Sequence, residues 1–89
     1  MTVHYIYMLR CADDTLYVGE TRDVVARVLR HEAGEASAFT RTRRPVTLVY
    51  AEAHRDMLRA LARERQLKRW TRAKKDALIA GDLTLLKRL

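Results

Sequence analysis

The first apolar stretch of the chain, TVHYIYMLR at residues 2–10, has the two-residue period that is typical of a β-strand. The turn-forming residues CADDT follow at positions 11–15, and LYVGE at positions 16–20 has the composition of a second short strand. Because the turn is so short, the two strands are predicted to pair as an antiparallel hairpin. Gly19 is expected to end the second strand and to let the chain turn sharply there.

The pattern then changes to the spacing of an amphipathic helix. Residues 24–32, preceded by two possible capping residues, Thr21 and Asp23, carry a valine- and leucine-rich stripe. Residues 34–45 are predicted to be a loop, and VTLVYAEA at 46–53 is rich in the β-branched residues that strands favour. Helices are predicted further along, at residues 57–70 and 72–80 and as a last helical turn in the tail 83–89.

The predicted order is therefore β-β-α-β-α-α, in a single domain that spans residues 1–89. This order favours an α/β fold of the α+β kind, in which a small three-stranded antiparallel sheet is packed with helices. A chain of 89 residues can bury only a thin hydrophobic core.

Charge and composition narrow the choice of partners and compartment. Eighteen Lys and Arg face eleven Asp and Glu, which gives a net charge of +7 and favours nucleic acid as a partner. The single cysteine, Cys11, cannot close an internal disulfide, and no apolar run approaches the roughly 20 residues that span a bilayer. The first residues also lack the features of a signal peptide. We therefore expect a cytoplasmic protein with no membrane contact.

One carboxylate does not fit a simple amphipathic helix. Glu64 lies within the apolar stripe of the predicted helix 57–70, between Leu61 and Leu67. A buried carboxylate needs a cation, a hydrogen-bond network or a metal ion. The simpler alternative is a position at the rim of the core, paired with Lys68 one turn later.

Four other residues also have both a functional and a structural interpretation. Arg27 and His31 share one face of the predicted helix 24–32, and the hydroxyls of Tyr7 and Tyr17 can converge across the hairpin. The structural alternative is a solvated helix edge with a histidine near its C-terminal dipole. Strand tyrosines, in turn, are usually core residues whose hydroxyls reach the surface.

Clusters of basic residues follow these positions. Arg41, Arg43 and Arg44 crowd the predicted loop, and Lys68, Lys74 and Lys75 lie on the helices that follow. We expect these six side chains to contact a nucleic-acid backbone, which positions a ligand without reading its sequence. A solvated basic loop is the alternative for the three arginines.

Taken in order, a set of short motifs resembles the GIY-YIG nuclease family. The motifs are YIYMLRC, LYVG, the Arg27–His31 pair, TRTRRPVTLVY and ALARERQLK around Glu64. The resemblance covers nearly the whole chain, and it is closest to short stand-alone bacterial members of the YhbQ type. It implies the GIY-YIG fold.

The resemblance also implies an activity, namely metal-dependent hydrolysis of phosphodiester bonds. The expected substrate is DNA more than RNA, chosen by structure or backbone rather than by sequence, as in DNA repair or recombination. Glu64 would hold Mg²⁺ or Mn²⁺ and Arg27 would clamp a phosphate oxygen, while Tyr7, Tyr17 or His31 would position or deprotonate the attacking water. No obligate protein partner is evident, and we expect a monomer.

The sequence departs from the family pattern in ways that leave a second function open. Tyr5 replaces the first glycine of the family name, and the hairpin turn has Asp13 and Asp14 in place of a glycine. Many active family nucleases use an asparagine downstream of the metal-binding glutamate, and this chain contains no asparagine. The alternative function is a catalytically weak or inactive nucleic-acid-binding module.

Overall fold

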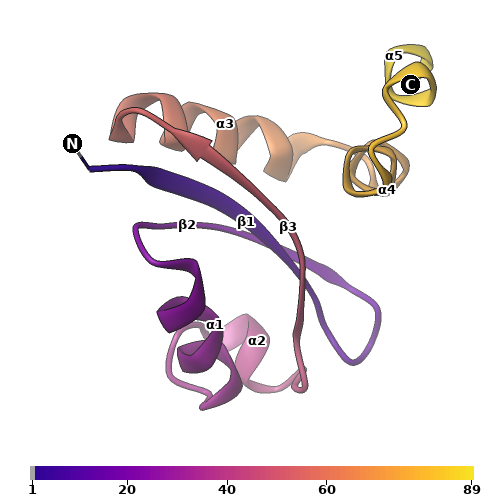
Figure 1. Cartoon of the computed structure of the whole chain (residues 1–89). Coiled ribbons are helices and arrows are strands. Elements are labelled where there is room, and N and C mark those ends of the chain that lie inside the picture. Colours follow the sequence, from indigo (N-terminus) through magenta and orange to yellow (C-terminus); the bar gives the residue numbers. More distant parts are fainter. Residues whose placement is uncertain (1) are drawn as a thin grey trace.

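A computed structural model describes residues 2–89 and confirms the predicted arrangement of a three-stranded antiparallel sheet with helices (Figure 1). The elements in chain order are β1 His4–Arg10, β2 Leu16–Thr21, α1 Val24–Glu32, α2 Ala38–Arg41, β3 Thr47–His54, α3 Met57–Arg69, α4 Arg72–Ala80 and α5 Leu83–Arg88. Among the described residues, no helix is both long and apolar enough to cross a bilayer.

The predicted helix boundaries follow local capping chemistry. Asp23, Asp56 and Thr71 each accept a hydrogen bond from a backbone amide in the first turn of α1, α3 and α4, respectively. Gly81 ends α4 in the left-handed conformation, at φ +71°. One helix was not predicted, because the expected loop 34–45 contains the short helix α2. Ser37 caps that helix by accepting from the amide of Thr40 at 3.2 Å.

The sheet has the strand order β2-β1-β3, so the first strand of the chain is its central strand. Both pairings are antiparallel, and Tyr7 lies opposite Gly19 on one side and Ala51 on the other. Four consecutive residues of β1, from Ile6 to Leu9, are fully buried because both faces of the central strand are covered.

Each face of the sheet carries its own small core, and helices lie on both sides of it (Figure 1). Ile6 and Met8 point to the face covered by α3, where they meet Ala60 and Leu67. The alternate residues of β1, Tyr7 and Leu9, point to the face covered by α1 and α2. There they form a cluster with Cys11 and Val46, against which Tyr17 and Val28 pack. Because side chains alternate along β1, Ile6 and Met8 belong to the core under α3, whereas Tyr7 and Leu9 belong to the core under α1 and α2.

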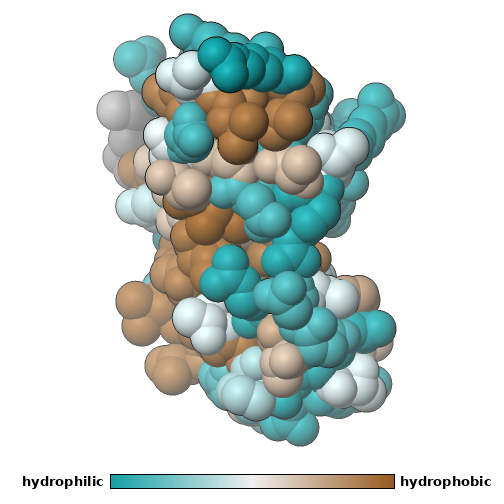
Figure 2. All heavy atoms as spheres, turned by 90° about the vertical axis from the view of Figure 1, so that its right-hand side faces the viewer, coloured by the Kyte–Doolittle hydropathy of each residue, from teal (hydrophilic) through white to brown (hydrophobic). Residues whose placement is uncertain are grey.

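The C-terminal helix docks less completely than the others. Leu86 of α5 packs against the core on the α3 side, whereas Leu83 and Leu85 remain exposed. Figure 2 shows this side of the molecule, with hydrophobic side chains gathered in its upper part, where α4 and α5 lie. The predicted helical turn in the tail is thus present, but it covers only part of the apolar surface.

Gly19 has a different role from the one predicted, because β2 continues through it to Thr21 and no turn occurs there. A Cβ atom at Gly19 would lie 2.5 Å from the hydroxyl oxygen of Tyr7 and 2.6 Å from the ring carbon that bears it. Tyr7 is fully buried, so its ring cannot move aside at little cost. Glycine is needed inside this strand because an aromatic ring lies directly against its backbone.

A network of polar side chains ties the edge strand β3 to α3. The carboxylate of Glu52 accepts from Arg63 Nε at 3.0 Å and Nη2 at 3.2 Å, from His54 Nε2 at 2.6 Å, and from the hydroxyl of Tyr50. Burial opposes ionisation of Glu52, but the hydrogen bonds from Tyr50, Arg63 and His54 outweigh it and lower the pKa of this carboxyl. Glu52 therefore stabilises the folded chain in its ionised form.

We expect Glu52→Gln to lower the free energy of unfolding by about 1.5–3 kcal/mol at pH 7, because it removes a charge that accepts several hydrogen bonds. The folded-state pKa of Glu52 lies below the unfolded value, so its contribution is present above the unfolded pKa and is lost as pH falls through the folded pKa. Urea unfolding of wild type and variant should therefore converge once the pH falls through the lowered folded-state pKa of Glu52. Glu35→Gln, at an exposed glutamate, is the control. A deficit that does not depend on pH would contradict this explanation.

We expect Gly19→Ala to lower the free energy of unfolding by about 1–3 kcal/mol, because the added methyl group collides with the buried Tyr7 ring. The same substitution in a Tyr7→Leu background lacks the clash and should cost at most a few tenths of a kcal/mol, roughly the error of additivity. Chemical unfolding of the four proteins gives the comparison. An equal cost in both backgrounds would show that the ring does not account for the glycine.

Candidate active site

Three buried side chains form a chain of hydrogen bonds on the α1 side of the sheet. The Tyr7 hydroxyl lies 2.8 Å from Nε2 of His31, and Nδ1 of His31 lies 2.7 Å from the hydroxyl of Thr40. All three residues are 0% exposed. One assignment satisfies every partner: Thr40 donates to the carbonyl of Ser37 at 3.4 Å, Nδ1–H donates to Thr40, and Tyr7 donates to Nε2.

The protonation of this pair follows from its surroundings. Burial lowers the pKa of His31, and the positive charges of Arg27 and Arg30 lower it further. Burial and the neighbouring Tyr17 raise the pKa of Tyr7 to about 12, although Arg27 acts in the opposite direction. At pH 7 the pair is therefore a neutral phenol and a neutral imidazole, and the imidazole is able to accept a proton.

Tyr17 connects this buried pair to a cavity of about 220 Å³ at the β2 edge of the sheet. Its ring centroid lies 5.0 Å from that of His31 and 6.3 Å from that of Tyr7. Tyr17 also stacks on Phe39 of α2, with 6.0 Å between centroids. We call this cavity the Tyr17 cleft; it is lined by Leu16, Tyr17, Val18, Phe39, Lys68 and Lys75.

Arg27 and Glu64 reach the same region from the two helical layers. Both lie close enough to Tyr7 to act on its pKa, which Arg27 lowers and Glu64 raises. The guanidinium of Arg27 donates to the carbonyl of Glu20 at 3.4 Å, and the half-buried Arg27 comes from α1. The other four predicted site residues thus all lie close to Tyr7.

Glu64 has features of both positions considered from the sequence, a buried carboxylate and a residue paired with Lys68. Its side chain is only 18% exposed, and it pairs with Lys68 at 3.3 Å on the next turn of α3. Because Lys68 also lines the Tyr17 cleft, this ion pair stands at the cleft rather than at a remote rim.

The six basic residues predicted to contact nucleic acid divide into separate groups. Lys68 and Lys75 line the Tyr17 cleft, whereas Lys74 lies 5.7 Å from the centre of the Trp70 ring. Arg43 covers the Phe39 ring at 3.8 Å and pairs with Asp13 at 3.1 Å. Arg44 donates to the backbone carbonyls of Arg41 and Glu32. The side chain of Arg41 is exposed. Arg43 and Arg44 therefore organise the segment around α2.

Thr40 and Phe39 were not found by sequence reasoning. Both belong to the segment predicted to be a loop, and nothing in its local pattern indicated that Thr40 would meet a histidine nine residues earlier. The one available signal was Ser37, whose spacing from Thr40 is typical of a helix cap.

A metal ion would have one protein carboxylate at this site. Across residues 2–89, no group of three or more His, Cys, Asp or Glu side chains is arranged to hold a metal. Mg²⁺ is commonly held by one or two carboxylates together with waters and substrate phosphates. Glu64, which is poorly exposed and paired with the exposed side chain of Lys68, fits a site of that kind.

Comparison with known proteins places these residues in a family. The family model of the GIY-YIG catalytic domain matches residues 3–76. A UPF0213 protein of Natronomonas pharaonis is 47% identical over 79 residues, covering 89% of this chain and 93% of its own. A UPF0213 protein of Staphylococcus aureus is 44% identical over 79 residues, covering 89% and 96% of the two chains, respectively.

A solved structure agrees with these matches. The solution NMR structure of a UPF0213 protein from Bacillus halodurans superposes with a TM-score of 0.58 at 36% identity, covering 88% of this chain and 83% of the other. Fold, motif order and sequence identity therefore agree, and the chain belongs to the GIY-YIG catalytic-domain family.

Proposed function

We propose that the protein is a divalent-metal-dependent endonuclease that hydrolyses phosphodiester bonds in DNA with little sequence specificity. The observation that carries this proposal is the buried Tyr7–His31 hydrogen bond of 2.8 Å, which stands behind a cleft flanked by cations. Membership of a family defined by a catalytic domain supports a hydrolytic role, and the net charge of +7 supports a polyanionic substrate.

The proposed substrate phosphate lies in the Tyr17 cleft. Lys68 and Lys75 line that cleft, and Arg27 supplies a planar fork of donors that suits phosphate oxygens. Positive groups placed in advance stabilise the charge that develops on the phosphate oxygens in the transition state. Lys68, which pairs with Glu64 in the free protein, turns its ammonium group to the phosphate when substrate is bound.

The attacking water gives its proton to the hydroxyl oxygen of Tyr7 as Tyr7 passes its own proton to Nε2 of His31. Tyr17 is the tyrosine that lines the cleft, so it is placed to position the water. His31 is neutral at pH 7 and accepts the proton released by Tyr7, while Thr40 holds the other ring nitrogen. Glu64 would hold Mg²⁺ or Mn²⁺, which polarises the phosphate and stabilises the leaving oxygen when bound.

We expect Glu64→Gln and Tyr7→Phe each to reduce cleavage of branched, flapped or single-stranded DNA by about 10²–10³-fold, as for the loss of one transition-state stabiliser. Glu35→Gln, at an exposed glutamate, should cleave like wild type. Gel assays with Mg²⁺, with Mn²⁺ and with EDTA give the rates. Equal cleavage by wild type and Glu64→Gln would overturn the assignment.

A second function, a nucleic-acid-binding module that cuts poorly, is favoured by one observation. The chain contains no asparagine, although many nucleases of the family it resembles use one downstream of the metal-binding glutamate. In this case the wild type would bind DNA in EDTA and release no product with any metal.

The contribution of the Tyr17 cleft to DNA binding can be measured through salt dependence. Each phosphate contact with duplex DNA contributes about 0.9 to the slope of log K against log salt, so Lys68→Gln/Lys75→Gln should flatten the slope by about 1.8. Lys87→Gln/Arg88→Gln removes the same charge from α5 and should change the slope much less. Binding is followed in EDTA, where no cleavage occurs. An equal change in both variants would place the DNA elsewhere.

A further inference from the structure

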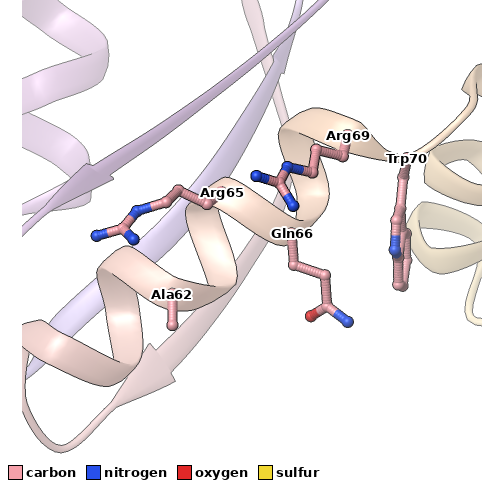
Figure 3. Close-up of a pocket in the computed structure, with 5 residues that line it drawn as sticks. All are labelled: Ala62, Arg65, Gln66, Arg69 and Trp70. Carbon is pink, nitrogen blue, oxygen red and sulfur yellow. The ribbon is translucent and has the colours of Figure 1, made fainter.

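A second hollow, of about 420 Å³, lies on the outer side of α3 and at its C-terminal end. It is lined by Ala62, Arg65, Gln66, Arg69 and Trp70, and we call it the Trp70 hollow. Figure 3 shows Gln66 and Trp70 extending in the same direction with open space between them, while Arg65 and Arg69 extend from successive turns of the helix. No acidic side chain lines this hollow.

The tryptophan is held in place by the core and by a fixed arginine. Trp70 is half-buried and packs against the core on the α3 side. Arg63, whose guanidinium lies 5.1 Å from the ring centre, is itself held by Glu52 and by Gln66 at 2.8 Å. An aromatic ring that is already ordered loses little conformational freedom when it binds a ligand.

The two arginines of the hollow are available for a ligand. Five arginines of the described residues pair with carboxylates, among them Arg63 with Glu52 and Arg72 with Asp76. Within residues 2–89, neither Arg65 nor Arg69 makes an ion pair, and both are exposed. Exposed guanidinium groups one turn apart, beside a tryptophan, suit the phosphates and the bases of a nucleic-acid strand.

We propose that the Trp70 hollow binds single-stranded nucleic acid, with an unpaired base stacked on Trp70 and phosphates held by Arg65 and Arg69. This inference rests on the proposed function and names its substrate class, namely nucleic acid with an unpaired segment extending beyond the point of cleavage. Stacking on an aromatic side chain contributes roughly five- to 150-fold in affinity per base, and duplex bases do not offer their faces for it.

The position of the hollow relative to the Tyr17 cleft supports a continuous path. Arg65 and Arg69 directly follow Glu64 and Lys68 in sequence, so each pair of neighbours is turned about 100° around α3. A strand that leaves the cleft past Lys68 therefore reaches Arg69 after passing a little more than a quarter turn around α3, a helix about 10 Å wide with its side chains. The hollow thus continues the cleft on the adjoining face of α3.

Trp70 is the only tryptophan of the chain, so its intrinsic fluorescence reports on this hollow alone. Full-length Glu64→Gln protein is titrated in EDTA with oligothymidylate, with oligouridylate and with a blunt duplex of equal length. We expect both single strands to quench the fluorescence and the duplex to leave it nearly unchanged. The tighter of the two single strands identifies DNA or RNA as the source of the unpaired segment.

Two sets of variants keep the proposal open to contradiction. Arg65→Gln/Arg69→Gln should weaken binding of the single strand by at least tenfold and lower its salt slope by about 1.4, at about 0.7 per phosphate. The control Arg55→Gln/Arg88→Gln, which removes the same charge from exposed positions outside the hollow, should have a much smaller effect. Trp70→Phe, followed by the anisotropy of a labelled oligonucleotide, should weaken binding of the single strand without changing duplex binding.

The results separate this proposal from the proposed nuclease activity. Quenching by duplex equal to that by single strands, or equal effects of the two arginine pairs, would overturn the Trp70 hollow as a single-strand site. Cleavage of branched DNA by wild type without any quenching leaves the nuclease proposal standing and removes this one. Quenching by single strands without cleavage would support the Trp70 hollow as a single-strand site and overturn the nuclease proposal.

Discussion

The contact between the ring of Tyr7 and the backbone of Gly19 determines much of the architecture around the candidate active site. Tyr7 stands on the central strand and is fully buried, so its ring has one place to lie, and that place requires the absence of a side chain at Gly19. Its hydroxyl then meets His31 at the end of α1, and His31 in turn meets Thr40 in α2. One close approach within the sheet thereby sets the position of both helices on that face. A buried hydroxyl and imidazole without these partners would cost stability, so packing and hydrogen bonding require the same arrangement.

The strong positive charge of the chain is used in two ways. Part of it is internal: Arg63 joins β3 to α3 through Glu52, and Arg43 covers Phe39 while pairing with Asp13. These cations hold the walls of the site in place. The rest faces outward, and Lys68 stands at the boundary between the two uses because it neutralises Glu64 and also lines the Tyr17 cleft. Net charge alone therefore overstates how much of the surface is available to a polyanion.

Helix α3 connects the two proposed nucleic-acid sites because its faces carry different chemistry. One face packs Ala60 and Leu67 into the core, and the outer face carries the Trp70 hollow. The face between them pairs Glu64 with Lys68, which lines the Tyr17 cleft. An α-helix turns about 100° per residue, so residues adjacent in sequence reach separate surfaces about one helix width apart. A rigid element of this kind holds the two sites at a constant separation, which a loop would not do. The arrangement makes α3 the central element of the proposed function.

Sequence by itself determined the three strands, every helix except α2, and the caps of α3 and α4, because periodicity and capping are local properties of the chain. The ordered motifs also pointed to Tyr7, Tyr17 and Glu64, which the structure brings close together. The tertiary structure alone decided what depends on neighbours distant in sequence. Gly19 proved to be a strand residue under an aromatic ring, Thr40 became the partner of His31, and four of the six basic side chains took positions outside the Tyr17 cleft. The physical reason is that a side chain's surroundings are set by packing between separate elements, which no local pattern records.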